Sequence, residues 1–186
     1  MKTDISIDVA APPELVFALA RDIERWPKLL PHYVSVTVLE RRADGSIVAQ
    51  LVARRPVLPV LGIGIPVAWR SRSWSEPETC RLRFVHQGGA TNGMDVTWRI
   101  EPAAQGAQLT IEHDFRPRLA PWAWFIDTFF TRPVAGRTLA TFKAIAEAVD
   151  AAGAGSAPTT EVFASRSSRP TKGAESESPQ PSKDLA

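Results

Sequence analysis

The chain has 186 residues, of which 44% are hydrophobic, so it is long enough to bury one substantial core. Its formal net charge of +2 is too small to indicate a nucleic-acid partner. No apolar stretch is long enough to span a bilayer, and Asp4 and Asp8 occupy the place where a signal peptide needs an apolar run. The single cysteine, Cys80, cannot form an internal disulfide, and we therefore expect a cytoplasmic protein.

The composition divides the chain once, near Ala151. Residues 1–150 mix apolar and polar residues with regular periods, which predicts one folded domain. Residues 151–186 are rich in Ser, Pro, Gly and charged residues and contain one aromatic residue. Such a segment cannot bury enough apolar surface to offset its ordering entropy, so it is predicted to be a disordered tail.

The first elements in chain order are a strand and two short helices. Residues 4–11 alternate between apolar and polar side chains, which indicates a strand. Pro12 and Pro13 suit a helix start. Pro27 is expected to end the second short helix at Trp26, because the residue before a proline is disfavoured in helical conformation.

Strands dominate the middle of the chain. Six further strands are predicted, at residues 32–42, 45–55, 67–76, 80–87, 93–102 and 107–117. The Pro- and Gly-rich segment 54–66 is poorly suited to a strand and is predicted to be a loop. Residues 120–152 predict a long amphipathic helix that Pro133 should kink or divide.

Strand parity assigns the two faces of this sheet, because side chains alternate along a strand. One face is predicted to be apolar, with Ser71, Ser73, His86 and His113 as its few polar groups. The other face carries charges of both signs and is predicted to be solvated.

Four segments together resemble a known superfamily. They are residues 7–41, with the box DIERWP followed by PHY, and the stretches VAWRSRSW (67–74), GMDVTWRIEP (93–102) and EHDF (112–115). Over residues 3–149 the chain resembles the START-like helix-grip superfamily (SRPBCC), in the branch of polyketide cyclase/dehydrase and coenzyme Q-binding proteins. The resemblance implies an α+β helix-grip fold. In this fold a curved antiparallel sheet of about seven strands wraps around a long C-terminal helix, with two short helices after the first strand.

The resemblance also implies a deep cavity between the sheet and the long helix, with the short helices at its mouth. Trp26 is expected to line this mouth or, alternatively, to plug the open end of the sheet as core. With strand parity, the expected ligand-binding residues are Trp26, Tyr33, Trp69, Ser71, Ser73, Phe84, Met94, Trp98, Ile111, Phe125 and Phe129.

Candidate catalytic groups face the same cavity. Aromatase/cyclases of the superfamily carry an arginine where this chain has Ser73, and a serine cannot stabilise an enolate as a cation does. Tyr33, His86 and His113 are the remaining candidates for acid–base chemistry, although buried histidines are also common as plain structural residues. The three histidines are scattered without ligand spacing, so neither a metal nor a cofactor is expected.

The expected function is binding or transfer of a hydrophobic small molecule such as a lipid, a quinone or a polyketide-like compound. The alternative is a polyketide cyclase or dehydratase that uses the acid–base residues of the same cavity, and a protein-interaction adaptor is the least favoured class. Residues 56–66 and 121–130 are apolar and flanked by Arg54, Arg55, Arg118 and Arg132. These segments either bury each other or form a peripheral membrane contact.

Overall fold

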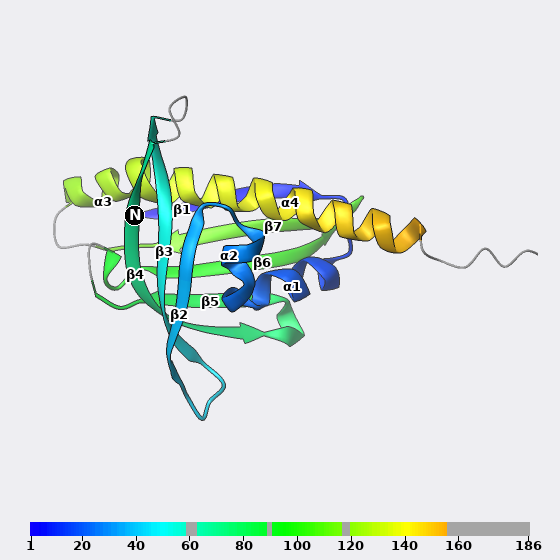
Figure 1. The fold of residues 1–186 in the computed structure, drawn as a ribbon, viewed down its shortest axis with the longest axis horizontal. Helices are drawn as coiled ribbons and strands as arrows, with labels where there is room; N and C mark the ends of the chain where they lie inside the picture. The colour runs from blue at the N-terminus through cyan, green and yellow to red at the C-terminus, as the bar shows by residue number, and fades with distance from the viewer. Residues whose placement is uncertain (59–62, 89–90, 117–119, 156–186) are drawn as a thin grey trace, which may run out of the picture. The chain divides into compact units, whose positions relative to one another are not determined.

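Seven antiparallel strands form a single sheet in the computed structural model, which describes residues 1–58, 63–88, 91–116 and 120–155 (Figure 1). The strand order is β1-β7-β6-β5-β4-β3-β2. The strands are β1 (Lys2–Val9), β2 (Tyr33–Arg41), β3 (Ile47–Leu58), β4 (Ile63–Glu76), β5 (Arg81–His86), β6 (Asp95–Ala103) and β7 (Gly106–Asp114). This architecture confirms the predicted α+β helix-grip fold.

Helices cover one face of the sheet. The long helix α4 (Arg132–Gly155) runs along this face, in Figure 1 roughly parallel to β6 and β7 and across β3 and β4. The connection from β1 to β2 consists of the helix α1 (Pro13–Arg21), the 3₁₀ turn η1 (Ile23–Arg25) and the short helix α2 (Trp26–Leu29). A second 3₁₀ turn, η3 (Pro77–Thr79), connects β4 to β5. The alternation predicted for β5 is confirmed, because Leu82, Phe84 and His86 are buried whereas Arg81, Arg83 and Val85 are partly exposed. The sheet therefore has one apolar face and one solvated face.

The prediction that Pro27 ends a helix is wrong. Trp26 has helical backbone angles, and Pro27 lies in the first turn of α2. A proline is tolerated there because the first N–H groups of a helix have no partner within the helix. The preceding helix α1 instead ends at Arg21, well before the proline.

The prediction that residues 54–66 form a loop is also wrong for the residues that the structure describes. Strand β3 extends to Leu58 and β4 begins at Ile63, with Arg54 opposite Pro66 and Pro56 opposite Gly64. The pairing of β2 with β3 ends at Ala53, so beyond this point the two strands form a two-stranded ribbon. Each strand of a ribbon has a free edge, where a missing N–H breaks no hydrogen bond of the sheet.

The C-terminal helical region changes from α-helical to π-helical geometry just before Pro133 but remains helical throughout. It begins with α3 (Ala120–Ile126), continues as a π-helical turn, η5 (Asp127–Thr131), and runs on as α4. Pro133 has no N–H to donate to the preceding turn, which accounts for an irregular helix at this point. Helix α4 continues through Gly155, so the predicted domain boundary at residue 150 falls within its last turns. The rest of the predicted tail, residues 156–186, lies outside the described residues. Within the described ranges, no helix is both long and apolar enough to cross a membrane.

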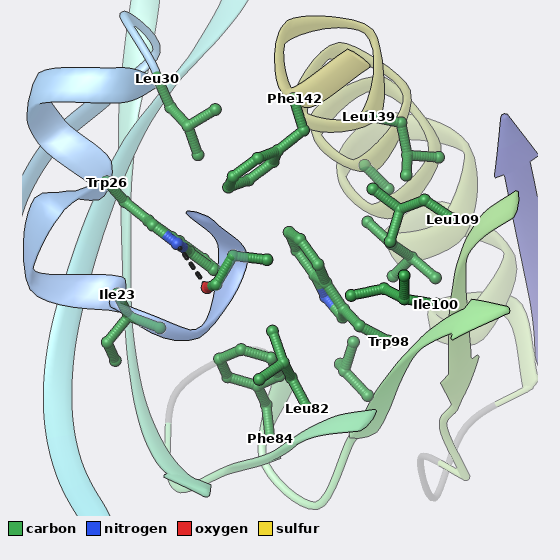
Figure 2. Close-up of a cluster of buried hydrophobic side chains, with 14 of the residues drawn as sticks. Ile23, Trp26, Leu30, Leu82, Phe84, Trp98, Ile100, Leu109, Leu139 and Phe142 are labelled. Atoms are coloured by element: carbon green, nitrogen blue, oxygen red, sulfur yellow. Dashed lines mark hydrogen bonds between the residues drawn. The ribbon is translucent and has the colours of Figure 1, made fainter. Parts of the chain in front are cut away.

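Trp26 is the centre of the aromatic core (Figure 2). Its ring stacks on Trp98 of β6 with 5.1 Å between centroids and meets Phe142 of α4 edge-on at 6.1 Å. The indole Nε1 donates a hydrogen bond to the Ala20 carbonyl oxygen at 3.0 Å, so its polar atom is satisfied although the residue is buried. One side chain thus joins the short helices, the sheet and α4, which supports the core role that we kept open for Trp26.

We predict that Gly106→Ala destabilises the fold by about 1–3 kcal/mol, because Gly106 has a φ of +125° in the turn between β6 and β7. A Cβ there would lie 2.3 Å from the Val9 carbonyl oxygen, which is backbone and cannot move aside easily. Gly136→Ala in α4 is the matched control, because its Cβ would meet open space and alanine favours helices by about 0.5–1 kcal/mol. Urea unfolding measures both effects, and equal stability of the two variants would contradict the prediction.

Candidate functional site

A small cavity lies between the concave face of the sheet and α4. Its volume is about 60 Å³, enough for roughly four water molecules at about 10–15 Å³ each. It is lined by Trp26, Tyr33, Leu51, Trp69, Phe84, His86, Met94, Val96, Trp98, Ile111, His113, Thr131, Val134, Ala135 and Thr138. Aromatic rings make up much of this wall, so the space is apolar with a few polar groups.

The structure brings most of the predicted site residues together in this wall. Trp26, Tyr33, Trp69, Phe84, Met94, Trp98, Ile111, His86 and His113 all line the cavity. Two other predicted residues, Phe125 and Phe129, lie outside the lining and are 44% and 37% exposed. Their ring centroids lie 5.0 Å apart, with the rings tilted to each other, at the surface of the helical region that precedes α4.

The two predicted serines are buried on the inner face of β4 but do not line the cavity. The Ser71 hydroxyl lies 3.3 Å from the Arg72 carbonyl oxygen and 3.4 Å from that of Val85, so it is satisfied by backbone. The Ser73 hydroxyl has no hydrogen-bond partner among the described residues. No lysine or arginine is among the described lining residues, so Ser73 is not replaced by a cation from elsewhere in this wall.

His86 projects into the cavity from the last position of β5. Its Nδ1 is hydrogen-bonded to the Thr91 hydroxyl at 2.9 Å, and its ring stacks on Trp69 at 5.9 Å. Burial lowers the pKa of His86 to about 3, and the nearby His113 adds to this decrease. The imidazole is therefore uncharged at neutral pH and acts as a hydrogen-bonding group.

His113 lies on β7, opposite Thr3 of β1. Burial lowers its pKa to about 4, and the Asp127 carboxylate and a hydrogen bond with the Thr3 backbone oppose this decrease. The Nδ1 atom of His113 is buried and has no hydrogen-bond partner among the described residues. This imidazole is also neutral at pH 7, and one of its nitrogens is available to a ligand.

Tyr33 begins β2 at the opposite part of the wall. Burial raises the pKa of its phenol above the ordinary value, although a hydrogen bond with the Thr138 side chain works against this increase. The Thr138 hydroxyl is also 2.8 Å from Nε2 of His32, a buried histidine that the sequence analysis did not select. Tyr33 therefore remains protonated and is held by a side chain of α4.

The residues that sequence reasoning missed come mainly from α4 and the π-helical turn. Thr131, Val134, Ala135 and Thr138 form one stripe that faces the sheet. Their spacing of three or four residues is a helical signal that could have identified the stripe. The sequence analysis assigned aromatic residues of the preceding helix to the ligand instead.

Metal chemistry has no visible basis in this wall. Within residues 1–58, 63–88, 91–116 and 120–155, no three His, Cys, Asp or Glu side chains lie close enough together to hold a metal ion. The polar groups of the cavity are therefore uncharged hydrogen-bonding groups: two imidazoles, a phenol and two hydroxyls.

A curved seven-stranded antiparallel sheet closed by a long C-terminal helix, with polar groups facing the space between them, defines a START-like helix-grip domain. The family model described as polyketide cyclase/dehydrase and lipid transport matches residues 1–150, and the chain belongs to this family.

Individual relatives agree with this assignment. A protein of Streptomyces halstedii named "Putative polyketide cyclase" is 43% identical over 105 residues, which cover 56% of this chain and 91% of the relative. A protein of the same name from Streptomyces cyaneus is 30% identical over 115 residues, covering 61% of this chain and 71% of the relative. The crystal structure of the Zhui aromatase/cyclase from Streptomyces sp. R1128 superposes with a TM-score of 0.68 at 21% identity, covering 82% of this chain and 98% of that one. This structural likeness supports the fold.

We predict that the protein loses stability as the pH falls from about 6.5 towards 4. Burial lowers the pKa values of His32, His86 and His113 to about 4, 3 and 4, whereas unfolded histidine titrates near 6.5. The unfolded state therefore binds more protons in this window, and stability is fully present only above it. Urea unfolding should show a loss of about 2 kcal/mol per histidine between pH 7 and pH 5.

His86→Gln is the matched variant for this measurement, because glutamine stays uncharged and can still bond Thr91. The difference in unfolding free energy between pH 7 and pH 5 should shrink by about one third in this variant. The lowered pKa values of Asp44 and Glu147 act mainly below pH 5 and contribute little to the difference between pH 7 and pH 5. Equal stability of the wild type at pH 7 and pH 5 would show that the histidines are not buried as described.

Proposed function

We propose that this protein binds, and passes on, a small and largely apolar molecule that carries oxygen groups, of polyketide-like chemistry, in the cavity between the sheet and α4. The observation that supports this proposal is the character of the wall. Aromatic and aliphatic side chains surround a few uncharged hydrogen-bonding groups. Three of these groups come from different elements: His86 from β5, His113 from β7 and Thr131 from the π-helical turn. Ligand pockets of proteins commonly combine an apolar surface with a few placed polar groups.

The size of the cavity limits how this ligand binds. Pockets for drug-sized molecules measure about 300–1,000 Å³, whereas this cavity measures about 60 Å³. A ligand with fused rings must therefore displace side chains when it enters. Met94 is suited to such movement, because its unbranched thioether chain adapts readily to new packing.

The electrostatics of the cavity favour binding over proton-transfer catalysis. An efficient general base has a pKa near the working pH, but the pKa values of His86 and His113 are about 3 and 4. The phenol of Tyr33 is shifted the other way and keeps its proton. The described lining residues also contain no cation that could stabilise an enolate.

Polyketide cyclase or dehydratase activity is the second candidate. It is supported by the names of the relatives and by the presence of two imidazoles and one phenol in a single cavity wall. In this alternative His86, His113 and Tyr33 would exchange protons with the bound ligand. Ligand binding that raises either imidazole pKa towards 7 would be required for this chemistry.

We predict that the neutral probe N-phenyl-1-naphthylamine binds the wild type and quenches its tryptophan emission, because Trp26, Trp69 and Trp98 line the cavity. Met94→Trp should weaken this binding by roughly 5- to 150-fold, the equivalent of about 1–3 kcal/mol of overpacking. Thr97→Trp is the control, since Thr97 lies on the solvated face of β6, the strand that begins directly after Met94. Unchanged binding to the Met94 variant would place the probe elsewhere.

A turnover assay separates the two candidates. Incubation with a polyketide-like ketone should leave the compound unchanged if the protein is a carrier. Turnover that is lost in His86→Ala or His113→Ala, while probe binding is preserved, would refute the carrier proposal and establish acid–base catalysis.

We also infer a peripheral membrane contact through an exposed aromatic patch on α3 and the π-helical turn. This patch consists of Trp122, Trp124, Phe125 and Phe129, which are 37–65% exposed and contact one another in pairs. Aromatic residues of this kind suit the interface of a bilayer, and a cytoplasmic carrier could collect an apolar ligand there. The second segment expected to contact a membrane is residues 56–66. Residues 59–62 of this segment lie outside the described residues, and Ile65 is 55% exposed.

We predict that the wild type sediments partly with vesicles of phosphatidylcholine and phosphatidylglycerol, and less at high salt. Trp124→Ser combined with Phe125→Ser should abolish sedimentation, because each buried apolar side chain contributes about 1.5–3 kcal/mol. Val149→Ser is the control, since Val149 is an apolar residue near the other end of the helical region and is 43% exposed, close to the 44% of Phe125. Equal sedimentation of the patch variant and the wild type would eliminate this contact.

A further inference from the structure

Two of the residues that line the cavity, one on β7 and one in the π-helical turn, each carry a buried polar atom without a partner. These atoms are Nδ1 of His113 and the hydroxyl oxygen of Thr131, and neither has a hydrogen-bond partner among the described residues. His113 is 8% exposed and Thr131 is 3% exposed. A buried polar group without a partner costs about 1–3 kcal/mol, so a ligand that satisfies it gains affinity.

The π-helical turn places Thr131 in the wall. The Arg132 N–H donates to the Asp127 carbonyl oxygen, which is the five-residue spacing of a π-turn. Ile126 and Thr131 are accordingly both buried although they are five residues apart. From Thr131 onward the buried positions follow the ordinary spacing of an α-helix, with Ala135 and Thr138 next in the same wall.

The carboxylate of Asp127 is already occupied and holds this turn against β1. One carboxylate oxygen accepts a hydrogen bond from the Thr3 hydroxyl at 3.0 Å, and the other accepts one from Nε of Arg132 at 2.9 Å. Thr3 pairs directly with His113 in the sheet. The π-helical turn that carries Thr131 is therefore tied to β1, the strand that pairs with His113, and the Asp127 carboxylate is already occupied.

We propose that Thr131 is a specificity-determining residue, whose hydroxyl binds a keto or hydroxyl oxygen at the end of the ligand that lies near β7. This inference rests on the proposed ligand-binding function and names the residue that recognises the oxygen group of the ligand, so ring compounds with an oxygen substituent should bind in preference to plain hydrocarbons. A hydroxyl group both donates and accepts, so either oxygen type suits Thr131. A hydrocarbon of the same shape would leave Thr131 and His113 unsatisfied.

The test compares 1-naphthol with 1-methylnaphthalene, which have nearly the same shape and differ in one oxygen. Binding of each is measured through tryptophan quenching, for the wild type, Thr131→Val and Thr131→Ser. The wild type should prefer 1-naphthol, and Thr131→Val should reduce this preference by about 2- to 12-fold, the loss of one hydrogen bond. Thr131→Ser keeps the hydroxyl and should keep the preference.

The control places a hydroxyl elsewhere in the same wall, in the double variant Thr131→Val with Val134→Thr. Its preference for 1-naphthol over 1-methylnaphthalene should be no higher than that of Thr131→Val alone. An equal preference for 1-naphthol in the wild type and Thr131→Val, with both variants folded by circular dichroism, would overturn the role of Thr131 and leave the binding function intact. Loss of the preference only in His113→Asn would assign the oxygen to His113 and would likewise overturn it. Failure of both compounds to bind would overturn the binding function and this inference together.

Discussion

The contact of Trp26 with Trp98 is the interaction on which the rest of the structure depends. It joins the short helices to the middle of the sheet, and the same indole meets Phe142 of α4. The three layers around the cavity therefore share one buried ring, and the space that remains after this packing is the cavity itself. Truncation of a buried tryptophan typically costs about 3–5 kcal/mol. The core and the wall of the cavity thus share Trp26, so a change at this side chain affects both.

Burial of the side chains in the wall determines the chemistry that the wall can offer. Burial disfavours charge, so the pKa values of the imidazoles of His86 and His113 fall and the pKa of the Tyr33 phenol rises. All three groups present neutral donors and acceptors at pH 7. Under the proposed function such a wall would select ligands by the position of their oxygen atoms, while the same burial makes the fold sensitive to acid.

Much of the fold and part of the site could be predicted from the sequence. Strand parity placed Phe84, Trp98 and Ile111 correctly because side chains alternate along a strand whatever its partners. The helical part of the wall could not be predicted in the same way. A π-turn changes which residues of a helix face the sheet, so aromatic Phe125 and Phe129 lie at the surface while Thr131 faces the cavity.

The ribbon formed by β3 and β4 beyond Ala53 bears on the behaviour of this protein at high concentration. Two strands that leave a sheet expose backbone edges, which can pair with the edge of another molecule and start aggregation. Pro56 and Pro66 lie in these two strands and have no N–H to offer to an incoming strand. The same prolines that made this segment unlike a strand in the sequence therefore keep the ribbon from acting as a template for intermolecular sheets.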